Sequence, residues 1–268
     1  MTKQVVLWIG ANAGGVSKTT LTVHIGYEMA ARHGMKVLAL DLDTNVSMAQ
    51  FCGLPKDRPW EQTTALIFNE EFDGNYPIVT PEWGSFGKGQ FDVCLGGTVM
   101  IQVSLDLATR SRREYTIADV LGDYPLPYDL ILLDCPASLG TLSDVALAAS
   151  THLLLPIEVS SKSLSGTDAL LTWYRVNCRK LRLKPVPSVL GVVPVQYDKE
   201  EAQQRSLMET LPEALKQQSI DCYPPVRYTP EFKNSAMQGV PLQVHRPKHR
   251  ALEDLQPICN DLEALIHG

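Results

Sequence analysis

The residues from Asn12 to Thr20, NAGGVSKTT, directly follow an apolar run and have the composition of a phosphate-binding loop. Gly14 and Gly15 let the backbone approach an anion closely and turn its N–H groups toward it. The helix that we expect to begin near Lys18 adds the positive end of its dipole. The candidate nucleotide-binding residues are therefore Gly14, Gly15, Val16, Ser17, Lys18, Thr19 and Thr20.

The loop departs from the usual pattern G-x-x-x-x-G-K-[ST], because Asn12 and Ser17 stand where the two flanking glycines belong. Within that pattern Lys18 reaches the β- and γ-phosphates of a nucleotide, and Thr19 offers its hydroxyl to Mg²⁺. A plain strand–turn–helix junction is the alternative for this stretch on its own.

Carboxylates follow two further apolar runs. In VLALDLD, Asp41 and Asp43 share a face at the end of an expected strand, since residues two apart in a strand do so. Carboxylates there can orient an attacking water, the role we expect for Asp43, or hold the water shell of a metal, the role open to Asp41. In YDLILLDCPASLG the expected strand ends at Asp134. A carboxylate at the tip of a strand is the pattern of one that contacts Mg²⁺ through a water molecule. A solvated helix cap is the alternative for Asp43.

These loops need a scaffold that brings them together. Apolar runs of strand length recur between helix-like segments, and their continuous apolarity indicates strands covered on both faces. We expect strands at Gln4–Gly10, Lys36–Leu42, Phe91–Gly96, Asp129–Asp134, His152–Ile157, Ser188–Val195 and, more weakly, Ile220–Val226. We expect helices at Lys18–His33, Thr141–Ser150, Ser163–Arg182, Lys199–Gln217 and Arg250–His267, the first of them ending at Gly34.

This alternation predicts an α/β fold: a doubly wound, mostly parallel sheet of about seven strands with helices on both faces, similar to P-loop NTPases. We expect one domain over residues 1–268, with an irregular excursion at Lys56–Gln90 that contains a short helix at Trp60–Glu70. In such sheets ligands bind at the carboxyl ends of the strands, where the three loops would converge.

The composition bears on nucleic-acid binding, membrane insertion and cysteine chemistry. The chain has 268 residues and a net charge of −6, so its surface as a whole does not favour nucleic acid, although local basic clusters could. No apolar run approaches the roughly 18 residues that span a bilayer, and we expect a cytoplasmic protein. The six cysteines are scattered without a C-x-x-C pair, which predicts buried free thiols.

The segments AGGVSKTTLTVHIGYEMAARHGMKVLALDLDTNVS, YDLILLDCPASLGTLSDVALAASTHLLLPIEVSSKSLSG, VLGVVPVQYD and FKNSAMQGVP resemble, in order and spacing, the deviant Walker-box ATPases of the ParA/MinD family. In that family ATP binding drives formation of a sandwich dimer, and slow hydrolysis ends it. The resemblance implies ATP and Mg²⁺ as ligands, a homodimer, Lys18 on the β/γ-phosphates, Thr19 and Asp134 at the metal, and Asp43 positioning water.

Three positions depart from the family. The pair Thr44-Asn45 replaces its usual Pro-Gln, and Ala13 replaces the lysine that crosses the dimer to the partner's phosphates. In lacking this lysine, the sequence resembles the carboxysome-positioning branch of the family, called McdA. A plasmid-partition member of the family could lack the lysine as well. Our candidate for the replacing cation is Lys162, in a loop at the same sheet edge, where a merely solvated lysine is the alternative.

The family's dimer binds either membrane or nucleoid. The last segment, ALEDLQPICNDLEALIHG, carries no lysine or arginine and contains Pro257, which disfavours a basic membrane helix. We therefore expect non-specific DNA as the surface, contacted by Arg227, Lys233, Arg246, Lys248 and Arg250. For a second basic group, at Arg175–Lys184, the simpler interpretation is a solvated helix face.

The sequence thus predicts a nucleoid-associated ATPase with weak activity of its own, which an adaptor protein stimulates and which positions a carboxysome or segregates a plasmid. Two alternatives stay open. One is a nucleotide-binding switch with negligible hydrolysis. The other is a metabolic P-loop enzyme, such as an amide-forming ligase or a metal-cluster reductase.

Overall fold

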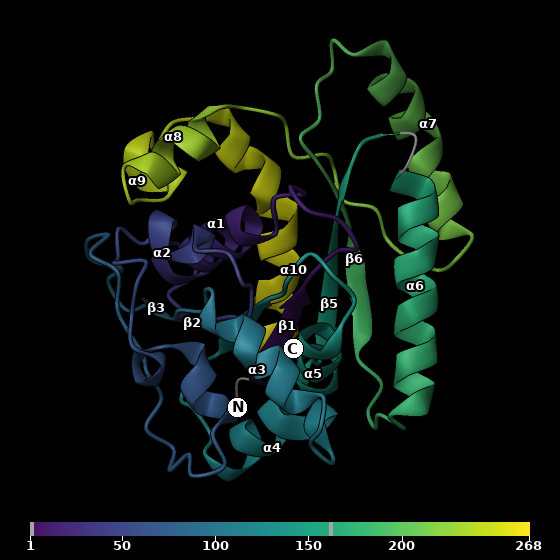
Figure 1. Cartoon of the computed structure of the whole chain (residues 1–268). Coiled ribbons are helices and arrows are strands. Elements are labelled where there is room, and N and C mark those ends of the chain that lie inside the picture. Colours follow the sequence, from purple (N-terminus) through teal and green to yellow (C-terminus); the bar gives the residue numbers. More distant parts are fainter. Residues whose placement is uncertain (1–2, 161–162) are drawn as a thin grey trace.

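A parallel sheet runs through the middle of the fold (Figure 1). The computed structural model describes residues 3–160 and 163–268, with the side chains of the second range described from residue 166. In this part of the chain the sheet has six strands in the order β3-β2-β4-β1-β5-β6. The strands are β1 (Val5–Ile9), β2 (Lys36–Asp41), β3 (Gln90–Cys94), β4 (Leu130–Asp134), β5 (His152–Glu158) and β6 (Ser188–Val195).

The predicted doubly wound fold is confirmed, with six strands in place of about seven. The weak seventh candidate, Ile220–Val226, lies beside β6 but makes only isolated bridges there, Val192 with Cys222 and Tyr197 with Arg227, in the described structure. Its sequence contains Pro224 and Pro225. Because proline has no N–H to donate to a ladder, two consecutive prolines prevent a regular strand.

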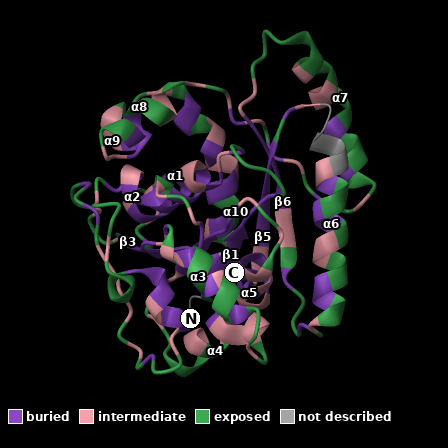
Figure 2. Cartoon of the chain, viewed as in Figure 1, coloured by how far each residue is buried: buried purple, intermediate pink, exposed green. Residues whose placement is uncertain are grey.

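Helices cover both faces of the sheet (Figure 1). In β1 the side chains of Val5, Leu7 and Ile9 pack in one buried cluster and those of Val6 and Trp8 in the other, as the alternation of a strand requires. The first cluster takes its helical side chains from α1 (Lys18–Ala31), α2 (Ser47–Phe51), α8 (Glu231–Met237) and α10 (Gln256–His267). The second takes them from α3 (Val99–Leu107), α4 (Thr116–Asp123), α5 (Thr141–Ala149), α6 (Ser163–Lys180) and α7 (Ala202–Lys216). Buried residues accordingly lie along the sheet and on the inner helix faces in Figure 2.

The five predicted helices are present, and the first ends before Gly34, which has the left-handed φ of 66°. The last one begins with the 3₁₀ turn η4 (Arg250–Leu255) and continues as α10. Helices α2, α3, α4, α8 and α9 (Leu242–His245) and the 3₁₀ turn η3 (Arg113–Tyr115) were not predicted from the sequence.

The excursion predicted at 56–90 is largely irregular. The expected helix at Trp60–Glu70 is divided into the 3₁₀ turns η1 (Trp60–Gln62) and η2 (Thr64–Phe68). Trp83 is buried, stacks on Phe91 of β3 at a ring distance of 5.0 Å, and donates its indole N–H to the carbonyl of Gly239 at 3.1 Å. The excursion therefore connects the β3 side of the sheet with the end of α8. No helix among the described residues is long and apolar enough to cross a membrane.

Candidate functional site

The three loops that the sequence analysis selected meet at one edge of the sheet. β4 lies between β1 and β2, and its last residue, Asp134, is in register with Ile9 on one side and Asp41 on the other. The phosphate loop and both acidic loops leave the sheet from these adjacent strand ends. The predicted convergence of the loops is therefore present in the structure.

The phosphate loop keeps a glycine-like conformation at Ser17. Gly15 has a φ of 76° and Ser17 a φ of 59°, both in the left-handed region. A residue with a Cβ pays roughly 1–2 kcal/mol there, which explains why the usual pattern has glycine. Ser17 precedes α1 directly, and in the described structure its side chain caps none of the first N–H groups of the helix. These N–H groups remain available for an anion.

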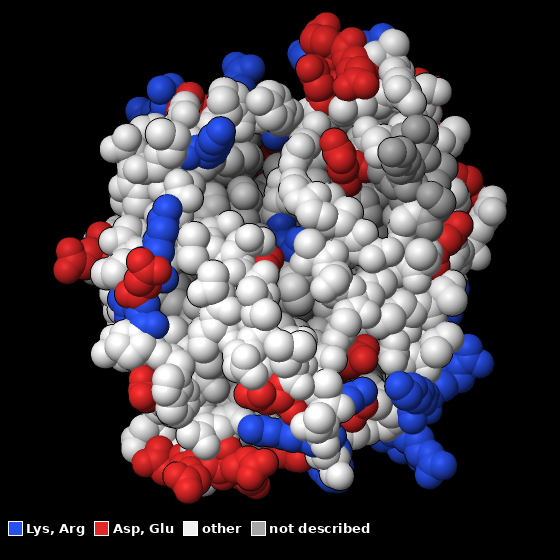
Figure 3. Space-filling view, viewed as in Figure 1, with Lys and Arg blue, Asp and Glu red and all other residues white. Residues whose placement is uncertain are grey.

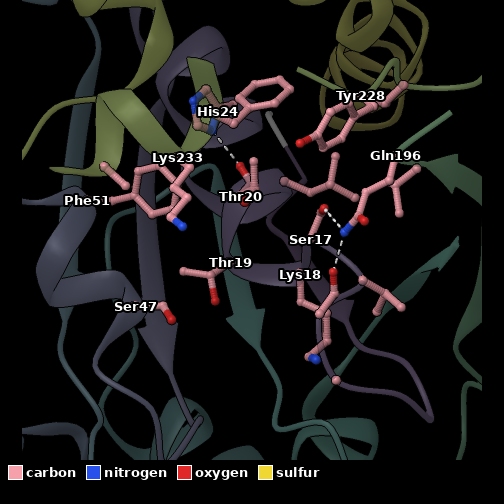
Figure 4. Close-up of a pocket in the computed structure, with 18 of the residues that line it drawn as sticks. Ser17, Lys18, Thr19, Thr20, His24, Ser47, Phe51, Gln196, Tyr228 and Lys233 are labelled. Carbon is pink, nitrogen blue, oxygen red and sulfur yellow. Dashed lines mark hydrogen bonds between the residues drawn. The ribbon is translucent and has the colours of Figure 1, made fainter. Parts of the chain in front are cut away.

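Gln196 braces this loop from the end of β6, and the sequence analysis missed it. Its side-chain amide donates to the carbonyl of Gly15 and to the hydroxyl of Ser17 (Figure 4). Gln196 itself has a left-handed φ of 57°. The available signal was its position in VPVQYD at the end of a strand, because such ends gather at the ligand edge.

Lys18 is buried, with 6% of its surface exposed, and lies against the loop that precedes it. Its Nζ donates to the carbonyl of Ala13 at 3.2 Å. A lysine held along its own loop by one neutral acceptor can exchange that acceptor for a phosphate oxygen, which makes a stronger, charge-assisted bond.

Asp134 is fully buried at the end of β4. Its Oδ1 accepts a hydrogen bond from the Thr22 hydroxyl at 3.3 Å, whereas Oδ2 has no partner among the described residues. Burial raises the pKa of Asp134 to about 7, the Thr19 hydroxyl acts in the opposite direction, and the charge of Asp43 adds to the rise. A buried carboxylate oxygen without a partner, next to a threonine hydroxyl, fits a site for Mg²⁺ or for its water shell.

Asp41 and Asp43 are both buried but differ in their hydrogen bonds. Each carboxylate oxygen of Asp41 accepts a backbone N–H at 3.0 Å, from Asp43 and from Gly96. Burial, followed by the charge of Asp134, raises the pKa of Asp41. Asp41 thus joins the loop after β2 to the end of β3. Its predicted role, to hold the water shell of a metal, stays a prediction. Asp43 accepts from the backbone and side-chain amides of Asn45, both at 3.1 Å, so Asn45 orients the carboxylate.

The phosphate loop, Asp43 and Asn45 line a cavity of about 440 Å³ (Figure 4), within the size range of small-molecule sites. Further lining residues come from the end of β6 and from the segment 226–236: Val195, Gln196, Val226 and Tyr228. In the described part of the chain no cluster of three His, Cys, Asp or Glu side chains could hold a metal. A cation at Asp134 therefore needs oxygens from water or from a ligand in addition.

His24 connects α1 with the C-terminal helices beside the cavity. The ring is fully buried, and its Nδ1 lies 2.6 Å from the carbonyl of Thr20. Its Nε2 accepts the backbone N–H of Leu242 at 3.0 Å, which assigns the proton to Nδ1. Burial lowers the pKa of His24 to about 4. The ring also packs edge-on against Phe51 and Phe232, from α2 and α8.

The five basic residues predicted to contact DNA fall into two sets. Arg227 and Lys233 line the cavity. Arg227 is held by two hydrogen bonds to the carboxylate of Asp254, at 2.7 and 2.6 Å. The other three are exposed after α8: Arg246, which pairs with Glu231 at 2.8 Å, and Lys248 and Arg250. Basic side chains accordingly gather over α8 and α9 at the upper left of Figure 3. Lys162 lies outside the described residues.

A parallel α/β sheet, a phosphate loop that opens a helix, and buried carboxylates at the neighbouring strand ends define a nucleotide-binding protein of the P-loop class. A family model described as an AAA domain matches residues 4–184. The chromosome partitioning protein ParA of Caulobacter vibrioides is 30% identical over 197 residues, which cover 72% of this chain and 70% of that protein. The chain belongs to the ParA/MinD family of ATPases.

Solved structures share the whole fold. A variant of McdA from Cyanothece in complex with ATP has a TM-score of 0.83 at 18% identity and covers 99% of this chain and 98% of its own. Cobyrinic acid a,c-diamide synthase from Mycobacterium smegmatis, bound to an ATP analogue and magnesium, has a TM-score of 0.79 at 20% identity, with coverages of 97% and 94%. At these identities the likeness concerns the fold alone.

Proposed function

We propose that this chain binds and hydrolyses ATP with Mg²⁺, dimerises around two nucleotides, and binds DNA without sequence preference in that state. An adaptor protein would stimulate hydrolysis and so release the chain from DNA. The cycle would segregate a plasmid or position a protein compartment over the nucleoid in the cytoplasm. The observation that carries the nucleotide part is the buried carboxylate of Asp134, whose Oδ2 has no partner among the described residues and which interacts with Lys18 and Thr19 of the phosphate loop.

Each residue of the site has a role in this proposal. The N–H groups after Gly14 would hold the phosphates, Lys18 would leave the Ala13 carbonyl for the β- and γ-phosphates, and Thr19 and Asp134 would hold Mg²⁺. Bound Mg²⁺ would neutralise charge that develops on the phosphate oxygens. Asp43, oriented by Asn45, would position the attacking water.

The proposal is tested by phosphate release from the full chain and from two single variants, Lys18→Ala and Asp43→Ala. We expect Lys18→Ala to lose ATP binding, and Asp43→Ala to keep ATP binding while losing hydrolysis. Lys216→Ala, at the exposed end of α7, is the matched lysine control. ATP binding by Lys18→Ala as tight as by the unmodified chain would refute the site.

The same assay separates a switch without hydrolysis from an ATPase. A switch would bind ATP and show no phosphate release with or without DNA, whereas we expect slow release in both conditions. Sedimentation with ATP and with ADP tests the dimer, which we expect with ATP only. Asp43→Ala should remain dimeric with ATP, because it would retain the nucleotide.

A further inference from the structure

A second lysine enters the nucleotide cavity from the side opposite the phosphate loop. Lys233 of α8 lines this cavity together with Lys18, Thr19 and Asp43. Figure 4 shows its side chain descending from α8, with the ammonium group pointing toward the part of the cavity where Thr19 and Ser47 lie. Thr19 belongs to the phosphate loop, and Asp43 lines the same cavity.

Lys233 is exposed, and no ion pair with a described residue neutralises its charge. Glu231, the acidic residue nearest in sequence, interacts with Arg246 at 2.8 Å and with His245 at 3.5 Å. Arg227, the other cation of this segment in the cavity, is paired with Asp254. Lys233 has neither an ion pair nor a hydrogen bond with any residue that the structure describes. Its ammonium group is therefore available to a ligand in the cavity.

α8 is packed firmly beside the cavity. Phe232 contacts the buried ring of His24 at a centroid distance of 4.8 Å. The backbones at the ends of α2 and α8 meet at two glycines, so closely that a Cβ on Gly239 would lie 2.7 Å from Cα of Gly53. Lys233 is thus presented by a helix that is fixed against both α1 and α2, and only its own side chain has to move to reach a ligand.

We propose that Lys233 binds the terminal phosphate of the nucleotide from within the same chain, and that it makes the site prefer the triphosphate to the diphosphate. This inference rests on the proposed ATP site. A triphosphate keeps a net negative charge with Mg²⁺ bound, and its terminal group would lie near Thr19 and Asp43. Ala13 contributes no charge to the phosphate loop, so Lys18 and Lys233 are the lysines that line the described cavity.

The experiment measures Mg²⁺-dependent binding of a non-hydrolysable ATP analogue and of ADP by calorimetry. A hydrogen bond to a charged group contributes more binding energy than a neutral one. Lys233→Ala should therefore weaken binding of the triphosphate about tenfold or more, and binding of ADP much less. Lys233→Gln, which keeps a donor but no charge, should also lose most of this preference. Lys233→Arg should restore it, and Lys216→Ala should bind both nucleotides as the unmodified chain does.

The outcomes separate this inference from the proposed function. If Lys18→Ala loses both nucleotides while Lys233→Ala binds as the unmodified chain does, the ATP site stands and the role of Lys233 is refuted. If Lys18→Ala also binds normally, the ATP site itself is refuted. An equal loss of ATP and ADP in Lys233→Ala, with restoration by arginine or without it, would overturn the preference for the terminal phosphate. Thermal unfolding of each variant identifies a loss that comes from misfolding.

Discussion

At the scale of single residues, burial makes the proposed Mg²⁺ site at Asp134 depend on pH. Its pKa in the fold, about 7, lies above the ordinary value of a carboxyl group because burial disfavours the charged form. The folded protein therefore binds more protons at this group than the unfolded chain does between about pH 4 and pH 7. Its contribution to stability is fully present below this window and is lost as the pH rises through it.

The first prediction follows from that shift. Mg²⁺ requires the charged carboxylate, so the Mg²⁺-dependent part of ATP binding should weaken by up to about tenfold for each pH unit below 7. In the absence of Mg²⁺, Asp134→Asn should unfold at higher denaturant concentration than the unmodified chain at pH 8, and this advantage should shrink at pH 5. Calorimetry and denaturant titration measure the two effects. A flat pH profile of Mg²⁺-dependent binding would contradict the assignment of Asp134.

The second prediction concerns the missing glycine of the phosphate loop. Ser17 adopts the left-handed conformation with a φ of 59°, so glycine should relieve strain whereas alanine should keep it. Both substitutions remove the hydroxyl that accepts from Gln196, which makes them matched controls. We expect Ser17→Gly to be about 1 kcal/mol more stable than Ser17→Ala in denaturant titration, with nucleotide binding retained. The reverse order would show that Ser17 does not adopt this conformation in solution.

At the scale of elements, His24 joins α1 to α9 through its neutral form. Burial lowers its pKa to about 4, below the ordinary value of 6.5. The unfolded chain therefore binds more protons at this position between those two values, and stability is lost as the pH falls from 6.5 toward 4. Protonated His24 could no longer accept the N–H of Leu242. Asp134 acts in the opposite direction over part of this window, so the two effects partly cancel in the unmodified chain.

The third prediction isolates His24 by comparison with His24→Gln, which cannot be charged. The free energy of unfolding of the unmodified chain should fall relative to that of the variant by up to about 3 kcal/mol between pH 6.5 and pH 4. The difference between the two pH profiles removes the contribution of Asp134 and of other common groups. Parallel profiles would mean that His24 remains accessible to protons in the fold.

The elements that could be predicted from the sequence are those with a clear local signal. The six long strands are continuous apolar runs, and α1 has Gly34 at its end, so both kinds of element were recognisable. α8 and α9 are helices of only 7 and 4 residues, too short for a hydrophobic period to emerge. They are held by tertiary contacts such as His24 with Leu242, which no local pattern encodes.

The same division applies to the site. Gly14, Lys18, Asp43 and Asp134 lie at the end of a strand or shortly after one and were found from local motifs. Gln196 and Lys233 reach the cavity from segments about 180 and 215 residues away from the phosphate loop in sequence. Their part in the site depends on how β6 and α8 pack beside α1, and this packing became visible only in three dimensions.

At the scale of the whole molecule, the charge distribution decides which surface could hold DNA. The chain as a whole is acidic, with a net charge of −6, so a DNA surface must be local. Among the basic side chains in Figure 3, one group lies over α8 and α9 and another at the lower end of α6. These places lie at opposite ends of the face shown. One duplex segment lying along α8 and α9 would leave the α6 group free.

The fourth prediction distinguishes the two groups by their salt dependence. Each phosphate contact that is lost should reduce the slope of log affinity against log salt by about 1, because one fewer counterion is released. Lys248→Ala, in the exposed segment after α9, should therefore weaken retention on DNA of any sequence and lower the slope with ATP present. Arg246→Ala should do so less cleanly, because Arg246 also pairs with Glu231.

Lys180→Ala, on α6, is the matched control, since Lys180 is equally exposed and belongs to the competing basic group. We expect it to leave both the affinity and the slope unchanged. The reverse result would be a lower slope for Lys180→Ala and an unchanged slope for Lys248→Ala. It would place the DNA surface on α6. The position of α8 makes the first result the expected one: α8 adjoins both the nucleotide cavity and the exposed basic segment, so a change at the nucleotide can reach that surface through one packed helix.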